Sequence, residues 1–278
     1  MNRTVRATLA SAALAALLAG CGAGVLPQVH SDADRLPLAQ QLYAKGDYAL
    51  ALEVLTPFTT SGTGSANVDR AIYLMGMCHL GGKEWAGAQG DFERLLRDYP
   101  ESDSAASAAF RLGEAYFGQS RGPDFDQEYT LKALDQWMSY RRDHPDHWLA
   151  GAAAQRIAEC RTRLATKLLH TGDLYLKLGD YRPAQVYFRN VIGEYSETPI
   201  YGDALVGLAL ADARLGARDS ALASLKEIEQ EFAGRPLADK AAEARKRILR
   251  EKPGTGASRR LNKPNEPPPP AAAPGVQP

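Results

Sequence analysis

Residues 84–100 read EWAGAQGDFERLLRDYP, and the spacing inside this stretch decides the fold. Ala88 is followed by Phe92 four positions later, and Pro100 comes eight positions after that. Residues four apart lie on the same face of a helix, and a proline cannot continue one. The stretch therefore predicts a helix that presents a small and a large side chain together to a neighbouring helix.

The same spacing returns along the chain. It is found as Ala133–Trp137–Pro145, Ala184–Phe188–Ser196 and Ala221–Leu225–Ala233, and Ala51–Leu55 begins a further copy. The segments ahead of three copies carry Gly76, Gly113 and Gly172, which let two helices approach closely. One helix pair cannot bury its own apolar face, but several stacked pairs can. The pattern resembles the tetratricopeptide repeat and predicts an all-α solenoid of about five helix pairs plus a C-terminal capping helix.

Apolar periodicity and the positions of Gly and Pro give the expected helices. We expect them at 33–45, 48–58, 68–81, 84–98, 103–118, 127–143, 147–178, 181–194, 200–215, 218–232 and 236–250. The third unit contains an insertion at 120–126, and the helix at 147–178 is unusually long because no proline interrupts it. Amphipathic helices account for nearly the whole body of the chain.

The first twenty residues have the features of a signal peptide. Arg3 and Arg6 are followed by an apolar run over 9–18, which is too short to span a bilayer because a transmembrane helix needs roughly 20 apolar residues. The segment ends in Leu-Ala-Gly-Cys at 18–21, which resembles a bacterial lipobox. We therefore expect cleavage before Cys21 and acylation of that residue, in preference to a plain secretory signal with an accidental cysteine. Several acyl chains hold a protein to a bilayer stably.

These observations predict four segments. They are a signal peptide at 1–20, a lipidated tether at 21–32, a tetratricopeptide-repeat solenoid at 33–252 and a Pro/Ala-rich tail at 253–278. The tail composition is typical of disorder. Gly22 follows the cysteine, whereas in lipoproteins of diderm bacteria an aspartate there marks retention in the inner membrane. We therefore expect the chain on the periplasmic face of the outer membrane.

Charge and motif content disfavour several functions. Without Arg3 and Arg6 the chain has 31 basic and 33 acidic residues, and nucleic-acid binding would need a basic face. No phosphate loop, nucleophile elbow, metalloprotease helix or Cys-x-x-Cys pair occurs, so we expect neither an enzyme nor a cofactor. Cys78 and Cys160 lie in apolar helical stretches, which favours buried free thiols over a disulfide.

Two polar clusters resemble metal sites but have a simpler interpretation. The stretch at 144–147, His-Pro-Asp-His, occupies the turn that 98–101 fills one unit earlier, so a structural role is favoured over metal binding. Asp124 and Asp126 lack the spacing of a calcium loop. Asp126 instead precedes a helix, where it is suited to cap the first turn.

In this architecture the first helix of each pair lines the concave face. Counting from the glycines and alanines places eight residues there: Gln40, Tyr43, Tyr73, Met77, Leu80, Phe110, Glu114 and Phe117. An apolar groove with a few polar groups suits an extended peptide. For any single one of these residues, packing against the adjacent repeat is an equally good interpretation.

A lipobox, a brief tether, about five repeats and a polar loop in the third unit together resemble the BamD family, the tetratricopeptide lipoproteins of the outer-membrane β-barrel assembly machine. The resemblance extends over 33–250 and includes the turn at His144–Pro145 and the long helix with Arg156, Arg161 and Arg163. The proline-rich tail departs from the family pattern, so nothing carries over to it.

The resemblance implies a scaffold that binds a BamA-like barrel insertase, accessory lipoproteins and the C-terminal targeting segments of unfolded outer-membrane protein precursors. The contact with the lipid bilayer would run through Cys21. Two alternatives stay open: a periplasmic tetratricopeptide lipoprotein that organises peptidoglycan or Tol–Pal machinery, and an accessory enzyme. The first is disfavoured because 22–70 shows no sustained heptads, and the second because no catalytic motif is present.

Overall fold

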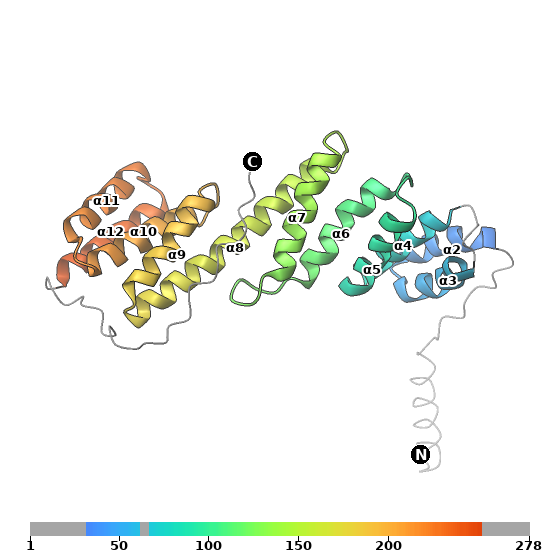
Figure 1. The fold of residues 1–278 in the computed structure, drawn as a ribbon, viewed down its shortest axis with the longest axis horizontal. Helices are drawn as coiled ribbons and strands as arrows, with labels where there is room; N and C mark the ends of the chain where they lie inside the picture. Colours follow the sequence, from blue (N-terminus) through green and yellow to red (C-terminus); the bar gives the residue numbers. More distant parts are fainter. Residues whose placement is uncertain (1–31, 62–66, 252–278) are drawn as a thin grey trace, which may run out of the picture. The chain divides into compact units, whose positions relative to one another are not determined.

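The computed structural model describes residues 32–61 and 67–251, and every regular element in these ranges is an α-helix (Figure 1). The eleven helices of the described ranges are α2 (Asp32–Lys45), α3 (Tyr48–Ser61), α4 (Val68–Gly81), α5 (Trp85–Asp98), α6 (Ala105–Gln119), α7 (Glu128–Asp143), α8 (Ala150–Leu178), α9 (Tyr181–Glu194), α10 (Tyr201–Arg214), α11 (Arg218–Glu231) and α12 (Pro236–Arg250). The predicted signal peptide, Cys21 and the tail at 253–278 lie outside the described residues.

The predicted all-α, tetratricopeptide-like class is confirmed, and the predicted helix ends agree closely with the structure. The largest differences are at α3, which continues past the expected residue 58, and at α8, which begins at Ala150 rather than 147. Helix α3 continues although Pro57 lies inside it. The hydroxyls of Thr56 and Thr60 each donate to the carbonyl four residues earlier, at 2.7 and 3.0 Å, within the same turns.

The helices group into two compact units that divide after Ala115, inside α6. In unit 1, α2 packs on α3 and α4, and α4 packs on both α3 and α5. The small–large pairs predicted from the sequence, Ala51 with Leu55 and Ala88 with Phe92, are completely buried. Gly76 explains the close approach of α4 to α5, because a Cβ atom there would lie 2.5 Å from the Phe92 ring.

Unit 2 contains α7 to α12. Helix α8 packs on α7, α9 and α10, and α12 packs on both α10 and α11. The aromatic partners Trp137 and Phe188 are fully buried, as is Leu225 in the last repeat. Helix α12 closes this core with Ala241 and Ile248, while much of its remaining surface is charged, as the prediction of a capping helix required.

The insertion at 120–127 is held against α8. Side chains spaced along α8 reach it in turn: Arg163 donates to the Ser120 hydroxyl at 2.7 Å, Lys167 to the Phe125 carbonyl at 2.6 Å, and His170 to Asp124 at 2.7 Å. Residues 163, 167 and 170 share one face of a helix. We call this segment the α8-docked loop.

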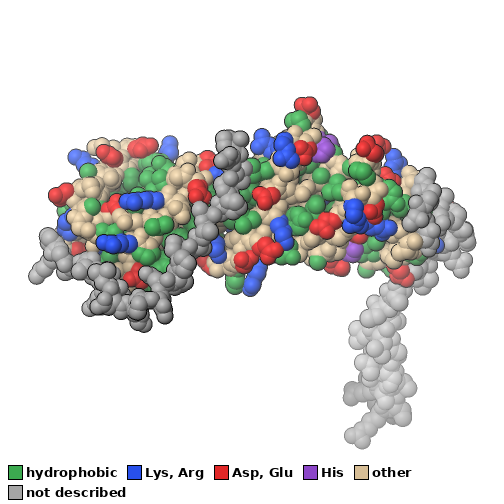
Figure 2. All heavy atoms as spheres, viewed as in Figure 1, with side chains coloured by type: hydrophobic (Ala, Val, Ile, Leu, Met, Phe, Trp, Pro, Cys, Tyr) green, Lys and Arg blue, Asp and Glu red, His purple; other side chains and the backbone are tan. Residues whose placement is uncertain are grey.

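The cysteines agree with their prediction, since Cys78 and Cys160 are both buried and free. Burial raises the pKa of each thiol to about 12. The surface is mixed in charge: on the face seen in Figure 2, basic and acidic side chains lie beside one another. In the described ranges no helix is at once long enough and apolar enough to span a bilayer.

Candidate functional site

The structure brings together part of the predicted groove in unit 1. Tyr43 of α2, Tyr73 of α4 and Glu114 of α6 surround a residue that sequence reasoning did not select, Arg111 of α6. Tyr43 interacts electrostatically with both Arg111 and Tyr73, and Arg111 hydrogen bonds Tyr73. We call these four residues the Tyr–Arg–Glu cluster. Three successive first helices contribute to it, as the repeat architecture predicts.

Arg111 is the polar centre of this cluster. Its Nη1 donates to Glu114 Oε2 at 2.6 Å, and the two side chains are only 25% and 19% exposed. Burial acts to lower the pKa of the guanidinium, but the bonds to Glu114 and Tyr73 more than offset it, so that pKa is raised. Within the described residues the Arg111 Nε is buried and has no hydrogen-bond partner. Arg111 is thus a charged donor held in place by Glu114 and Tyr73.

The tyrosines form the apolar walls of the cluster. Tyr43 packs against Tyr48 with ring centroids 5.6 Å apart, and Tyr73 packs against Phe92 at 5.9 Å. Burial, followed by the neighbouring Tyr48, raises the pKa of Tyr43 although Arg111 opposes this effect. The Tyr43 hydroxyl therefore keeps its proton at neutral pH and can both donate and accept a hydrogen bond.

The other predicted groove residues divide by exposure and position. Met77 and Leu80 of α4 are half-buried, and Gln40 of α2 is exposed. Phe110 is only 2% exposed, so its side chain belongs to the core and cannot line an open surface. Phe117 belongs to unit 2, where its ring lies 5.8 Å from Trp137 and beneath the Arg163 guanidinium. We therefore leave Phe110 and Phe117 out of the candidate surface.

A second polar pair lies on the α4–α5 side of unit 1. The His79 Nδ1 donates to Asp91 at 2.7 Å, and Glu84 lies 3.8 Å from the other ring nitrogen. The hydrogen bond to Asp91 raises the pKa of His79 against the opposing effect of burial. Gly87 makes room for the imidazole, since a Cβ there would lie 2.8 Å from the ring. His79 is therefore part of a packed helix interface.

The two clusters that resembled metal sites have structural roles. The Tyr140 hydroxyl lies 2.5 Å from His147 Nδ1, which also accepts the Leu149 amide at 3.3 Å. Asp126 accepts the Glu128 amide at 2.8 Å, so it satisfies an amide of the first turn as predicted, although the N-cap residue of α7 is Gln127. Both sets of side chains thus satisfy the ends of helices.

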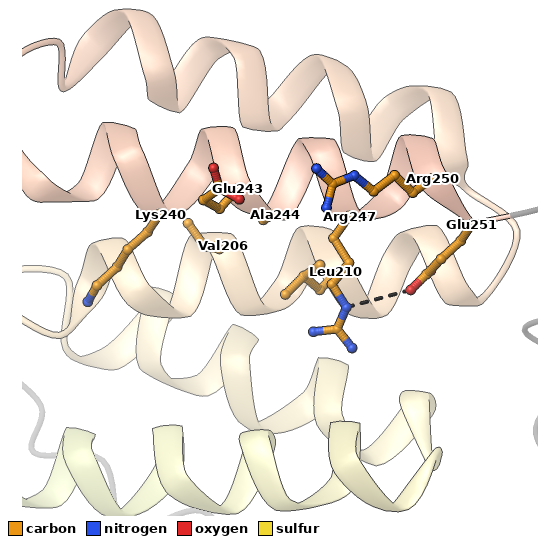
Figure 3. A pocket seen from close by; sticks show the side chains of 8 residues that line it. All are labelled: Val206, Leu210, Lys240, Glu243, Ala244, Arg247, Arg250 and Glu251. Carbon is orange, nitrogen blue, oxygen red and sulfur yellow. Dashed lines mark ion pairs between the residues drawn. The ribbon is translucent and has the colours of Figure 1, made fainter.

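Unit 2 has a groove between α10 and α12 that sequence reasoning missed (Figure 3). Its volume is about 640 Å³, and its lining is Val206, Leu210, Lys240, Glu243, Ala244, Arg247, Arg250 and Glu251. Figure 3 shows Lys240 and Arg247 reaching from α12 toward α10, with Leu210 between them. Arg247 pairs with Glu251 at 3.6 Å, and Lys240 pairs with Asp203 at 2.7 Å. The groove therefore has an apolar floor and a rim of mixed charge.

Comparisons with known proteins place the chain in a family. A BamD, described as an outer membrane protein assembly factor, from Caulobacter vibrioides is 27% identical over 219 residues, which are 77% of this chain and 72% of the relative. A thermophilic tetratricopeptide-repeat protein of Thermus thermophilus has a solved structure that is 20% identical, with a TM-score of 0.35, over 77% of this chain and 98% of that one. The family model of YfiO, described as an outer membrane lipoprotein, matches residues 79–227, more than half of the chain. The chain therefore belongs to the YfiO family of outer membrane lipoproteins.

Proposed function

We propose that this lipoprotein is a non-catalytic scaffold of β-barrel assembly, held on the periplasmic face of the outer membrane by acyl chains on Cys21. It binds the barrel insertase and the C-terminal targeting segments of unfolded outer-membrane proteins. Membership of the YfiO family supports the location, and the name of the Caulobacter relative supports the assembly role. Cleavage before Cys21 and the tether at 21–32 belong to the same proposal.

The observation that carries the proposal is the Tyr–Arg–Glu cluster. Half-buried aromatic walls around a polar centre suit a peptide whose apolar side chains alternate along an extended backbone. Such alternation is the pattern of a strand that will face lipid on one side of a barrel. Tyr43 and Tyr73 supply contact area, and Arg111 with Glu114 supplies orientation.

The groove between α10 and α12 is the candidate insertase surface. Its apolar floor and charged rim are typical of protein interfaces, in which charge steers the encounter and apolar contact stabilises the complex. It lies wholly in unit 2, whereas the peptide site lies wholly in unit 1. The two binding activities therefore depend on different residues and can be removed separately.

Peptide binding by the full chain in detergent tests the first activity. A fluorescent peptide ending in alternating aromatic and apolar residues should bind, and Tyr43→Ala with Tyr73→Ala should weaken it at least tenfold. Loss of two aromatic contacts in a binding site accounts for an effect of this size. The matched control is Tyr129→Ala with Tyr201→Ala, which removes two half-buried tyrosines of unit 2. Equal weakening by both pairs would count against the site.

Crosslinked purification from outer membranes tests the second activity. The wild-type chain should recover a barrel insertase, and Lys240→Glu with Arg247→Glu should reduce that recovery while peptide binding stays unchanged. A charge reversal on an interface rim slows association. Recovery of peptidoglycan synthases or Tol–Pal components in place of the insertase would instead support the alternative role as an organiser of those systems.

A further inference from the structure

We infer that Arg111 and Glu114 together bind the main chain of an uncharged, extended segment and do not bind a free carboxylate. The inference rests on the proposed peptide-binding function and specifies what the site selects. It makes the pair a specificity determinant: uncharged segments bind, and a terminal carboxylate adds nothing to the affinity.

The first step is the charge of the site. The guanidinium of Arg111 is already neutralised by the Glu114 carboxylate at 2.6 Å, in surroundings where both side chains are largely buried. An incoming carboxylate would be attracted by Arg111 and repelled by Glu114 at similar range. Opposite charges at similar distances cancel, so a carboxylate has little to gain and still loses its hydration.

The second step is hydrogen bonding. A guanidinium carries five N–H donors. Arg111 uses donors for Glu114 and Tyr73 and its Nε is buried, so a ligand can meet only its remaining Nη hydrogens. A peptide main chain presents carbonyl acceptors and amide donors in alternation. A fixed donor beside a fixed carboxylate acceptor, one helical turn apart, complements such a chain without any net charge.

The third step is the apolar surroundings. Tyr43 and Tyr73 approach the pair from α2 and α4, and Met77 lies one turn beyond Tyr73 on the same face of α4. The raised pKa of Tyr43 keeps that hydroxyl neutral. The walls therefore add contact area and neutral polar groups, which favours aromatic and aliphatic side chains over charged ones.

Two peptides that differ only at the C-terminus test the inference. Both are fluorescein-labelled ten-residue chains of alternating Phe or Val and Thr or Ser, one with a free carboxylate and one with a C-terminal amide. Fluorescence anisotropy with the full chain should give dissociation constants within twofold of one another. An amide that binds tenfold more weakly than the free acid would overturn the inference and leave the proposed function standing. Failure of both peptides to bind would overturn the proposed function and the inference with it.

Glu114→Gln provides the sharper test, because it removes the neutralising charge and keeps the size of the side chain. The free acid should then bind at least fivefold more tightly than the amide, since Arg111 becomes an unopposed cation. Arg111→Gln should weaken both peptides at least tenfold and equally. If the two peptides still had equal dissociation constants with Glu114→Gln, the inference would be overturned.

The matched control is the pair formed by Arg156 and Glu159 on α8. It has the same i, i+3 spacing and a distance of 2.9 Å, but it is more exposed and lies in unit 2. Glu159→Gln and Arg156→Gln should leave both dissociation constants and their ratio unchanged. Circular dichroism of all four variants establishes that helix content is retained, and a changed ratio in the α8 variants would also count against the assignment to Arg111 and Glu114.

Discussion

Units 1 and 2 use the same packing device in different ways. In unit 1 the Phe92 ring fits against Gly76 of α4 and also packs against the ring of Tyr73, a residue of the candidate site. In unit 2 the Phe188 ring fits against Gly172 of α8 and also against Gly207 of α10. The Phe92 ring thus supports a residue of the candidate site, whereas the Phe188 ring meets the backbones of both α8 and α10.

This difference shows how a repeat can diverge without changing its pattern. Each phenylalanine follows its alanine by four residues, and each is fully buried. The neighbours decide what the ring does. Around Phe188 the close contacts are two backbones, which makes a stiff stack. Around Phe92 one of the contacts is a side chain that also faces the Tyr–Arg–Glu cluster, which links local stability to binding.

Replacing Phe92 or Phe188 with alanine should distinguish the role in binding from the role in packing, and it gives the largest expected change in stability. Phe188→Ala and Phe92→Ala should each lower the free energy of unfolding by about 3–5 kcal/mol. Hydrogen–deuterium exchange should show lost protection across α8, α9 and α10 for Phe188→Ala, and across α4 and α5 for Phe92→Ala. Peptide binding should fall in Phe92→Ala alone. Identical exchange patterns in the two variants would remove the distinction.

Replacing the glycines that face the two phenylalanine rings with alanine should have a smaller effect. Added Cβ atoms would lie 2.5 Å from Phe92 at Gly76, 2.7 Å from Phe188 at Gly172 and 2.6 Å from Phe188 at Gly207. Overpacking of this kind costs about 1–3 kcal/mol per site, measured by urea unfolding. Gly172→Ala and Gly207→Ala should be non-additive because they displace the same ring.

Two glycines with open surroundings serve as matched controls for these variants. Gly90 of α5 and Gly193 of α9 have nothing within 4 Å of an added Cβ. Gly→Ala at an unobstructed helical position stabilises a helix by roughly 0.5–1 kcal/mol. If Gly76→Ala changed the free energy of unfolding in the same way as Gly90→Ala, the packing of Phe92 would not require a glycine at position 76.

The smallest expected effect is a pH dependence in unit 1. The bond to Asp91 raises the folded-state pKa of His79 above 6.5. The stabilisation is therefore complete below the unfolded-state pKa and is lost as the pH rises through the folded-state value. Unfolding monitored by exchange in α4 and α5 should show falling stability above neutral pH, and Asp91→Asn should abolish that trend.

An exposed counterpart in unit 2 calibrates this measurement. His170 and Asp124 lie at the same 2.7 Å separation but are 47% and 68% exposed. Asp124→Asn should change the free energy of unfolding by less than about 1 kcal/mol, because exposed ion pairs contribute little. Asp91→Asn should cost about 1.5–3 kcal/mol at low pH, as expected for a hydrogen bond to a charged group.

Most of the fold could be predicted because helix packing leaves a local signature. An alanine followed four residues later by a large apolar residue identifies the second helix of a pair, and proline or glycine marks where helices end. All of this information lies within one turn or one repeat. The helix ends therefore agree closely with the structure, including the loop that interrupts the third unit.

The candidate site could be predicted only in part, for two physical reasons. Phe110 and Glu114 share a helical face, but periodicity does not say how deeply that face is covered, and Phe110 is in the core. Arg111 was missed because a single arginine in a helix usually stays in solvent, and only the fold places Tyr73 and Glu114 around it. The groove of unit 2 depends on the packing of α12 against α10, two helices that are not consecutive in sequence.

Helix α8 is long enough to turn a small tilt at one end into a large displacement at the other. Its 29 residues correspond to a rod of roughly 43 Å. Helix α7 and the α8-docked loop hold one part of this rod, and α9 and α10 pack on it as well. By simple geometry, a tilt of about 5° at one end displaces the other end by roughly 4 Å over this length. A rigid tilt of α8 at its α7 end would therefore displace the helices that pack on its other part, α9 and α10, by a similar distance.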